Sequence, residues 1–185
     1  MIELQRKDLP LKGYITTFET IIDDKKMNDD IIKVIDKYGD RQNHKTNVKA
    51  QMTEWKMWKE PGFDKLSKII LDLGHKASIQ KYNRPVNLIM TNLWGMKYKS
   101  DETALSHDHW PSLWSCAYYV NAPKNAPGLF FPEMGEQGGE RKIEPGLLIM
   151  FEGTVKHAVR PAKFRGSRYV VSSNLNEDTR SYEDS

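Results

Sequence analysis

The stretch SHDHWPSLWSCAYYVN, residues 106–121, places two histidines directly before an apolar segment typical of a β-strand. His107 and His109 are two residues apart, and side chains two apart on a strand point to the same face. Asp108, between them, is then expected to point the other way. Two imidazoles directed into one space have the geometry of a metal chelate. The stretch therefore predicts a metal site beside a strand.

From residue 86 onward, short apolar segments alternate with turn-forming sequences such as NAPKNAPG, GEQGGE and KFRG. Many short strands separated in this way favour an antiparallel sandwich or barrel over a doubly wound sheet. The predicted strands are VNLIMTNLWGMKY (86–98), LWSCAYYVN (113–121), GLFFPE (128–133), PGLLIMFE (145–152), KHAVRPA (156–162) and SRYVVSSNL (167–175).

The first half of the chain carries two helical patterns. In residues 27–40, apolar residues recur at near-helical spacing, with Asn28 or Asp29 as the expected N-cap and Gly39 as the stop. Residues 61–82 form the second predicted helix, because their apolar positions also repeat at helical spacing.

These patterns predict an α+β, mainly β fold, in which N-terminal helices pack on one sheet of a jelly roll. The length of 185 residues fits one domain. Within it we expect a helical N-terminal layer over residues 1–85, a jelly-roll core over residues 86–175 and a polar tail over residues 176–185.

A third histidine, His157, lies near the end of the predicted sandwich. Jelly rolls bring early and late strands side by side, so His157 would complete a facial site with His107 and His109. An imidazole-rich site with open positions suits Fe(II), with Zn or Ni less favoured. No role is assigned to His44, in a polar loop, or to His75, expected at a helix end where a cation interacts well with the dipole.

Other residues are candidates for lining the same cavity. Arg168 opens the last predicted strand, and a guanidinium that faces into a sandwich is costly unless it meets an anion, such as a bidentate carboxylate ligand. The hydroxyl of Tyr118 or Tyr119 would need a partner if buried, and that carboxylate would be one. Asn92 and Trp94 share a strand face towards the cavity. The alternatives are a surface salt bridge for Arg168 and ordinary packing for the others.

Several motifs follow one another along the second half of the chain: NLWG, HDH, SCAYYV, GLFF, EPGLLIMF, His157 and Arg168. With these motifs in this order, the sequence resembles the double-stranded β-helix Fe(II)/2-oxoglutarate-dependent oxygenases. More narrowly, it is similar to an oxygenase family common in marine bacteria and their phages. The wider superfamily uses H-x-D for its first two ligands, whereas this chain has His109 at the second position, with Glu133 as a reserve carboxylate.

The resemblance implies a hydroxylase that couples oxidative decarboxylation of 2-oxoglutarate to C–H hydroxylation, with a peptidyl residue such as proline as one candidate substrate. It implies Fe(II) held by His107, His109 and His157, and 2-oxoglutarate whose distal carboxylate pairs with Arg168, helped by Tyr119. Two alternatives stay open. One is a three-histidine, cupin-like dioxygenase that uses no 2-oxoglutarate, and the other is a non-enzymatic jelly-roll module of a virion or carbohydrate-binding kind.

Composition restricts the remaining function classes. Hydrophobic residues make up 38% and charged residues 29% of the chain, as in soluble globular proteins. The net charge is +3 without a long block of like charge, which gives no indication of a nucleic-acid arm. A single cysteine suits a reducing compartment, and neither a signal-peptide core nor a membrane-span pattern is present. We expect a cytoplasmic protein, in the host cytoplasm if phage-encoded, whose partners are a small-molecule co-substrate and a protein or peptide substrate.

Overall fold

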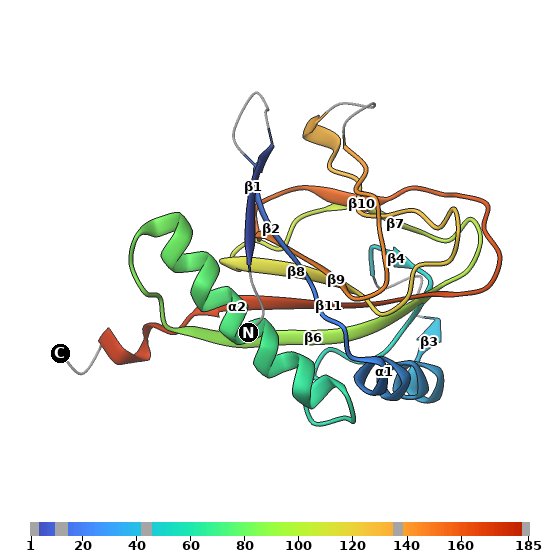
Figure 1. Cartoon of the computed structure of the whole chain (residues 1–185), viewed down its shortest axis with the longest axis horizontal. Coiled ribbons are helices and arrows are strands. Elements are labelled where there is room, and N and C mark those ends of the chain that lie inside the picture. The colour runs from blue at the N-terminus through green and yellow to red at the C-terminus, as the bar shows by residue number, and fades with distance from the viewer. Residues whose placement is uncertain (1–3, 10–14, 42–45, 135–138, 183–185) are drawn as a thin grey trace.

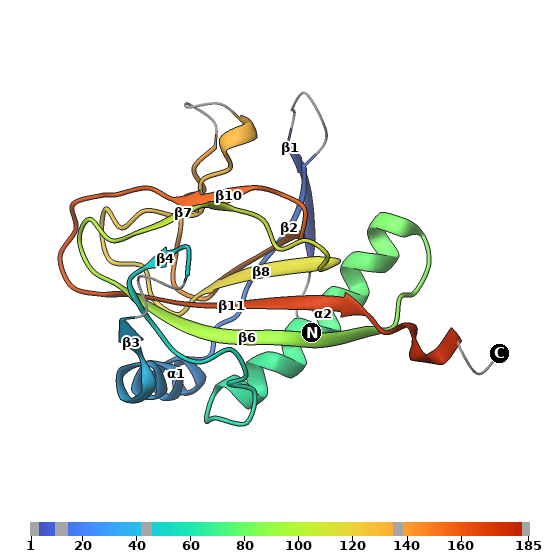
Figure 2. The same cartoon turned by 180° about the vertical axis from the view of Figure 1, so that it is seen from behind.

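The structure, a computed structural model, describes residues 4–9, 15–41, 46–134 and 139–182. Two helices, two facing β-sheets and the apolar layers between them form its body. In Figures 1 and 2, helix α1 (Lys25–Tyr38) lies on one side of the long strands of the large sheet and the small sheet lies on the other. His44 lies outside the described residues.

Among the described residues, eight antiparallel strands form the large sheet, in the order β1-β2-β9-β8-β11-β6-β5-β3, and three form the small sheet, in the order β10-β7-β4. Two facing antiparallel sheets are the predicted jelly roll. The strands are β1 (Gln5–Leu9), β2 (Ile15–Ile21), β3 (Asp40–Arg41), β4 (Val48–Lys49), β5 (Gln51–Met52), β6 (Leu88–Tyr98), β7 (Thr103–His107), β8 (Trp114–Tyr119), β9 (Leu147–Glu152), β10 (His157–Val159) and β11 (Arg168–Glu177).

Alternation along the strands divides the side chains of the large sheet between two apolar layers. On β8, Cys116 and Tyr118 pack in the layer shared with the helices, whereas Ala117 and Tyr119 pack in the layer between the two sheets. This division agrees with the faces expected from the sequence. The second layer is the one into which the candidate site residues point.

Helix α1 begins earlier than predicted. Its N-cap is Asp24, whose Oδ1 accepts a hydrogen bond from the backbone N–H of Met27 at 2.9 Å, so Asn28 and Asp29 are not the cap. The predicted stop at Gly39 is confirmed.

Helix α2 (Phe63–Tyr82) runs through Gly74, so His75 lies inside the helix and not at its end as expected. A Cβ on Gly74 would lie 2.5 Å from Cδ1 of Leu175, which shows that the glycine permits close packing of the helix on the sheet. The Nδ1 of His75 lies 2.9 Å from the carbonyl oxygen of Val86, a structural contact that supports leaving this histidine without a catalytic role.

The N-terminal 85 residues contribute strands as well as helices. β2 pairs with β9 inside the large sheet, and β4 pairs with β7 in the small one. The expected helical layer is therefore incomplete, and the jelly roll begins well before residue 86. The β2 segment ITTFETI is rich in β-branched residues, which is the signal for a strand that the helical interpretation overlooked.

Two predictions near the later strands also need correction. GLFFPE (128–133) is not a strand: Phe130 makes only isolated bridges, and a 3₁₀ helix spans Pro132–Met134, since proline lacks the N–H that a ladder needs. The expected tail at residues 176–185 is ordered at its start, because β11 reaches Glu177 and a second 3₁₀ helix spans Thr179–Tyr182.

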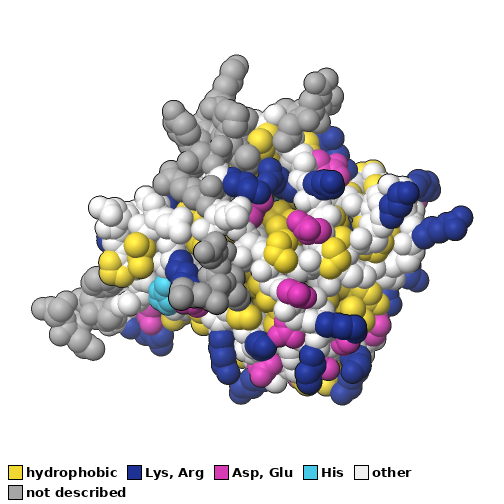
Figure 3. All heavy atoms as spheres, viewed as in Figure 1, with side chains coloured by type: hydrophobic (Ala, Val, Ile, Leu, Met, Phe, Trp, Pro, Cys, Tyr) yellow, Lys and Arg dark blue, Asp and Glu magenta, His cyan; other side chains and the backbone are white. Residues whose placement is uncertain are grey.

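The surface agrees with the mixed charge of the sequence. On the face shown in Figure 3, Lys and Arg side chains are interspersed with Asp and Glu side chains and do not form a field of one sign. No helix within the described ranges combines the length and apolar character needed to cross a bilayer. Location in the cytoplasm stays a prediction.

Candidate metal centre

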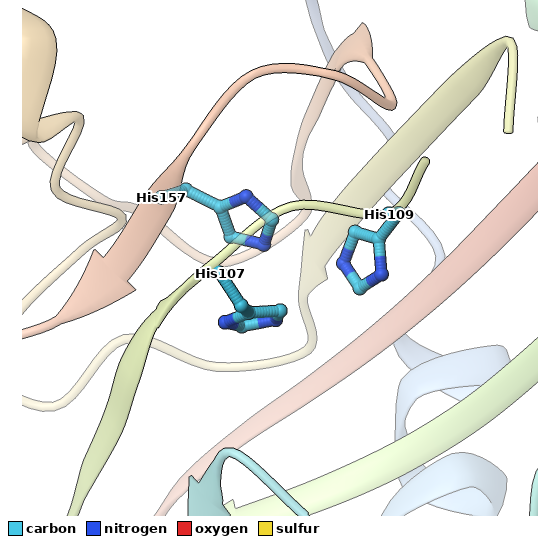
Figure 4. A group of neighbouring side chains, drawn as sticks. All are labelled: His107, His109 and His157. Carbon is cyan, nitrogen blue, oxygen red and sulfur yellow. The ribbon is translucent and has the colours of Figure 1, made fainter. Parts of the chain in front are cut away.

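Three imidazoles meet between the two sheets. His107 ends β7, and His157 begins β10 directly opposite it in the antiparallel pair. The possible ligand atoms of His107, His109 and His157 all lie within 4.8 Å of one another, and the ring centroids are 4.5–4.9 Å apart. Figure 4 shows the three rings directed towards a common space. The structure thus brings together the three histidines grouped from the sequence.

Backbone carbonyls select the nitrogen that each ring offers. The Nδ1 of His107 lies 2.6 Å from the carbonyl oxygen of Leu105, and the Nδ1 of His157 lies 3.0 Å from that of Val155. A carbonyl oxygen only accepts, so Nδ1 carries the proton and Nε2 keeps its lone pair. Carbonyl contacts of this kind orient metal-binding histidines in many proteins.

Burial keeps two of the three rings neutral. Burial, with smaller contributions from His107 and His109, lowers the pKa of His157 to about 3. Burial, with a smaller contribution from His107, lowers the pKa of His109 to about 4. Neutral imidazole is the form that binds metals, so both rings are ready ligands at pH 7.

The chain reaches His109 by a turn and not by a continuing strand, since β7 ends at His107. The backbone N–H of His109 bonds to the carbonyl oxygen of Gly153 at 2.6 Å, which anchors the turn to the end of β9. Asp108 is exposed, and its Oδ1 accepts from the backbone N–H of Trp110 at 3.2 Å. Asp108 therefore points away from the imidazoles, as expected, and stabilises the turn.

No carboxylate joins the cluster within the described ranges. Glu133, the reserve carboxylate, is exposed in the 3₁₀ helix. The ligand set that the described residues offer is therefore three imidazoles without a carboxylate.

Arg168 is buried, with a relative exposure of 1%, at the start of β11. Its guanidinium lies over the ring of Tyr98 at 4.2 Å from the centroid, and one N–H donates to the carbonyl oxygen of Pro127. Its Nε has no partner, and no described carboxylate forms an ion pair with it. Burial lowers the pKa of Arg168. The alternative of a surface salt bridge is thus excluded, and a buried cation with a free donor calls for an anion.

Tyr119 lies beside this guanidinium. Its hydroxyl oxygen accepts from the backbone N–H of Leu129 at 2.9 Å. Burial raises the pKa of Tyr119 and of Tyr98 to about 12, while Arg168 lowers both, so the two phenols stay protonated at pH 7. Tyr98 was not among the sequence candidates. Strand parity would have found it, because Tyr98 shares the inner face of β6 with Trp94, four residues earlier.

Trp94 is buried beside the histidines. Its ring centroid lies 5.9 Å from that of His109 and 4.8 Å from that of Trp55, and its Nε1 has no hydrogen-bond partner. Asn92 lies two residues earlier, and its Oδ1 is 3.5 Å from Nδ2 of Asn174. Trp55 and Asn174, which contact Trp94 and Asn92, are further residues that sequence reasoning missed.

Comparisons with known proteins bear on the fold. The sequence matches no family model, and a search of curated proteins gives no match. Among solved structures, the viral collagen prolyl hydroxylase of Paramecium Bursaria Chlorella virus-1, in its 2-oxoglutarate complex, superimposes with a TM-score of 0.61 at 17% identity, covering 85% of this chain and 94% of the viral one.

Two other solved structures give similar values. A Pseudomonas putida prolyl-4-hydroxylase has a TM-score of 0.60 at 15% identity, covering 83% of this chain and 85% of its own. A Trichoplax adhaerens prolyl hydroxylase, in complex with a hypoxia inducible factor peptide fragment, has a TM-score of 0.60 at 14% identity, covering 86% of this chain and 80% of its own. The chain therefore has the fold of these hydroxylases, which confirms the predicted double-stranded β-helix.

Proposed function

We propose that this protein is an Fe(II)- and 2-oxoglutarate-dependent hydroxylase. The observation that carries the proposal is the buried guanidinium of Arg168, whose Nε is unpaired and which has no carboxylate partner among the described residues, together with three converging imidazoles. The guanidinium lies over Tyr98, in the inter-sheet apolar layer that also contains Trp94 beside His109. The likeness in fold to prolyl hydroxylases, one of them in complex with 2-oxoglutarate, supports it.

The donor set fits a ferrous ion. The rings of His107, His109 and His157 face a common space and supply three ligands, as in a facial site, so that an ion of higher coordination number would have positions left for further ligands. Iron accepts imidazole readily, and the open positions allow a chelating co-substrate to bind. The bound metal and co-substrate would supply the oxidising chemistry, in which 2-oxoglutarate is decarboxylated to succinate and a substrate C–H bond is hydroxylated.

Arg168 and Tyr119 would hold the distal carboxylate of 2-oxoglutarate. A guanidinium binds a carboxylate with two parallel hydrogen bonds, and the protonated Tyr119 hydroxyl can donate a third. Arg168 pairs in register with Tyr98, whereas Ser172 pairs with Trp94 beside the histidines. Arg168 and the histidines thus lie at positions four residues, or about 13 Å, apart along the strands. We infer that 2-oxoglutarate lies along this direction, with its keto-acid end at the imidazoles and its distal carboxylate at Arg168.

The proposed primary substrate is a peptidyl residue such as proline. Apolar side chains are exposed next to the imidazoles: Trp110, directly after His109, is 75% exposed, and Leu105, two residues before His107, is 52% exposed. Exposed aromatic residues are typical of surfaces that bind peptides, including proline-rich ones. The bound peptide in the Trichoplax structure supports the same class of partner.

A three-histidine dioxygenase without 2-oxoglutarate is the second candidate, and the lack of a carboxylate among the described ligands favours it. That enzyme has no need of a buried arginine, which costs stability when no anion pairs with it. A non-enzymatic jelly-roll module needs neither Arg168 nor the histidine cluster. Arg168 therefore favours the first candidate over both alternatives.

Anaerobic titration of the protein with Fe(II) and then 2-oxoglutarate tests the proposal. We expect a visible metal-to-ligand charge-transfer band and, on admission of oxygen, succinate formation that depends on both additions. His157→Ala is expected to abolish the band, whereas the control His75→Ala, which alters a histidine bonded to Val86, leaves it intact. No band at saturating 2-oxoglutarate would reject the proposal. Oxygen consumption that needs no 2-oxoglutarate and forms no succinate would favour the second candidate.

A further inference from the structure

The indole N–H of Trp94 is a buried donor without an acceptor in the described part of the chain. Buried tryptophans usually bond through this group. Trp114, which is equally buried, does so: its Nε1 donates to Oγ of Ser78 at 2.8 Å. An unpaired buried donor costs stability, so the Trp94 N–H is a candidate for a bond that forms only when a ligand is present.

Two neighbouring rings fix the position of the indole. It contacts the Trp55 ring at 4.8 Å between centroids and meets the His109 ring edge-to-face at 5.9 Å. Trp94 belongs to the apolar layer between the two sheets and is 3% exposed. Its buried N–H is therefore held next to a candidate metal ligand, and a group bound at the metal is the acceptor that a ligand could supply there.

Position along the strand shows which end of a ligand Trp94 can reach. Trp94 lies four residues from Tyr98, over which the Arg168 guanidinium lies. That separation is about 13 Å along the strand, too far for both residues to bond one carboxylate. Trp94 is instead at the metal end, next to His109. Because the described ligand set contains no carboxylate, an anion is the expected companion of a cationic metal there, and N–H bonds to anions are the stronger ones.

We propose that Trp94 donates its indole N–H to the metal-bound carboxylate of 2-oxoglutarate, so that Trp94 and Arg168 hold opposite ends of the co-substrate. This inference rests on the proposed function. It makes Trp94 a co-substrate-binding residue whose contact is independent of the distal carboxylate.

Anaerobic binding of three acids to the Fe(II)-loaded protein separates the two ends. 2-Oxoglutarate has both a keto-acid and a distal carboxylate, and pyruvate has only the keto-acid end. Succinate has no keto group and serves as the reference that cannot chelate through a keto acid. Trp94→Phe keeps an aromatic ring and removes the donor, so we expect about tenfold weaker binding of both 2-oxoglutarate and pyruvate, with Fe(II) affinity unchanged. Arg168→Met should weaken the binding of 2-oxoglutarate and leave the binding of pyruvate unchanged. Trp114→Phe, the matched control, should lower the melting temperature without changing either affinity.

The outcomes are distinguishable from failure of the proposed function. If wild-type protein with Fe(II) binds neither keto acid, the function itself is wrong. If it binds both and Trp94→Phe binds them equally well, the function stands and the role of Trp94 is overturned.

A measurement on the wild-type protein covers the case in which Trp94→Phe does not fold. The chain has five tryptophans, so ¹H–¹⁵N spectra of the Zn(II)-loaded protein should show five indole signals. Pyruvate and 2-oxoglutarate should each move one signal strongly downfield, that of Trp94, identified by its through-space contact with the Trp55 ring. An indole signal of Trp94 that stays in place on saturation with both acids would reject the inference.

Discussion

Replacement of Arg168 by methionine tests whether the buried charge of this residue serves to bind an anionic ligand. Methionine has a similar length and no charge, so it removes the guanidinium and keeps much of the packing. In the ligand-free protein the guanidinium is buried, with one bond to the Pro127 carbonyl, a ring contact with Tyr98 and an unpaired Nε. The cation–π contact stabilises by about 0.5–2 kcal/mol, whereas removing a poorly compensated buried charge is often neutral or stabilising by about 1–4 kcal/mol. We therefore expect the free energy of unfolding of Arg168→Met to equal or exceed that of the wild type.

The cost appears only when 2-oxoglutarate binds. Removing one partner of a buried charge pair costs about 3–5 kcal/mol, because the other charge is left unpaired. The Kd for 2-oxoglutarate should therefore rise by about a hundredfold to several thousandfold. The histidines are untouched, so the Kd for Fe(II) should stay within about threefold.

The assay is an anaerobic titration of 2-oxoglutarate into the Fe(II)-loaded variant, followed by the charge-transfer band, beside urea unfolding of the ligand-free protein. Arg160→Met is the matched control, since that guanidinium also lies over an aromatic ring, Phe130, at 3.3 Å from the centroid, but on a less buried residue that follows β10. A variant of Arg168 that binds 2-oxoglutarate within threefold of the wild type would refute the assignment.

Three other predictions concern the metal centre and the core. His157→Ala should lower the affinity for Fe(II), measured by competition with a chelator, by at least about a hundredfold. An unchanged affinity would exclude this ring as a ligand. In the folded protein the pKa values of His109 and His157 are about 4 and about 3, below the ordinary value of 6.5, so the unfolded chain binds more protons than the folded one between pH 6.5 and pH 4. The free energy of unfolding of the metal-free protein should therefore be greatest above pH 6.5 and fall towards pH 4, by about 1.4 kcal/mol per pH unit for each histidine. Urea midpoints that stay constant from pH 7 to pH 4 would contradict this. Gly74→Ala should lower the free energy of unfolding by about 1–3 kcal/mol, because its Cβ would overlap Leu175; a stabilised variant would mean that the helix and sheet can move apart freely.

The part of the site that the sequence predicted follows from strand periodicity. Side chains two apart on β8 divide between the two apolar layers as expected, and His107 meets His157 because a jelly roll pairs an early strand with a late one. His109 reaches the same space by a turn that no periodicity specifies; its place depends on the bond from its N–H to Gly153, far away in sequence.

The errors have equally local causes. β1, with the sequence QRKDL, is an edge strand whose charged residues hide its pairing with β2. The Asp24 cap was missed because it precedes the apolar pattern of α1 by several residues. Whether Nε1 of Trp94 and Nε of Arg168 find hydrogen-bond partners depends on tertiary packing, and a sequence pattern therefore cannot predict that they are unpaired.

If the proposed function is right, a histidine at position 109, where the resembling oxygenases have a carboxylate, makes metal and co-substrate depend on one another. Three imidazoles would leave the charge of a divalent ion uncompensated by the described residues, and Arg168 is a further buried positive charge. The dianion 2-oxoglutarate is then the counter-charge for both, and the metal is in turn the largest attraction for the dianion. The coupling between two bound ligands is reciprocal, so 2-oxoglutarate must raise the affinity for Fe(II) by the same factor by which Fe(II) raises the affinity for 2-oxoglutarate. A carboxylate at position 109 would neutralise part of that charge and reduce the mutual dependence. In the proposed hydroxylase, His109 would therefore couple occupancy of the metal site to the presence of 2-oxoglutarate.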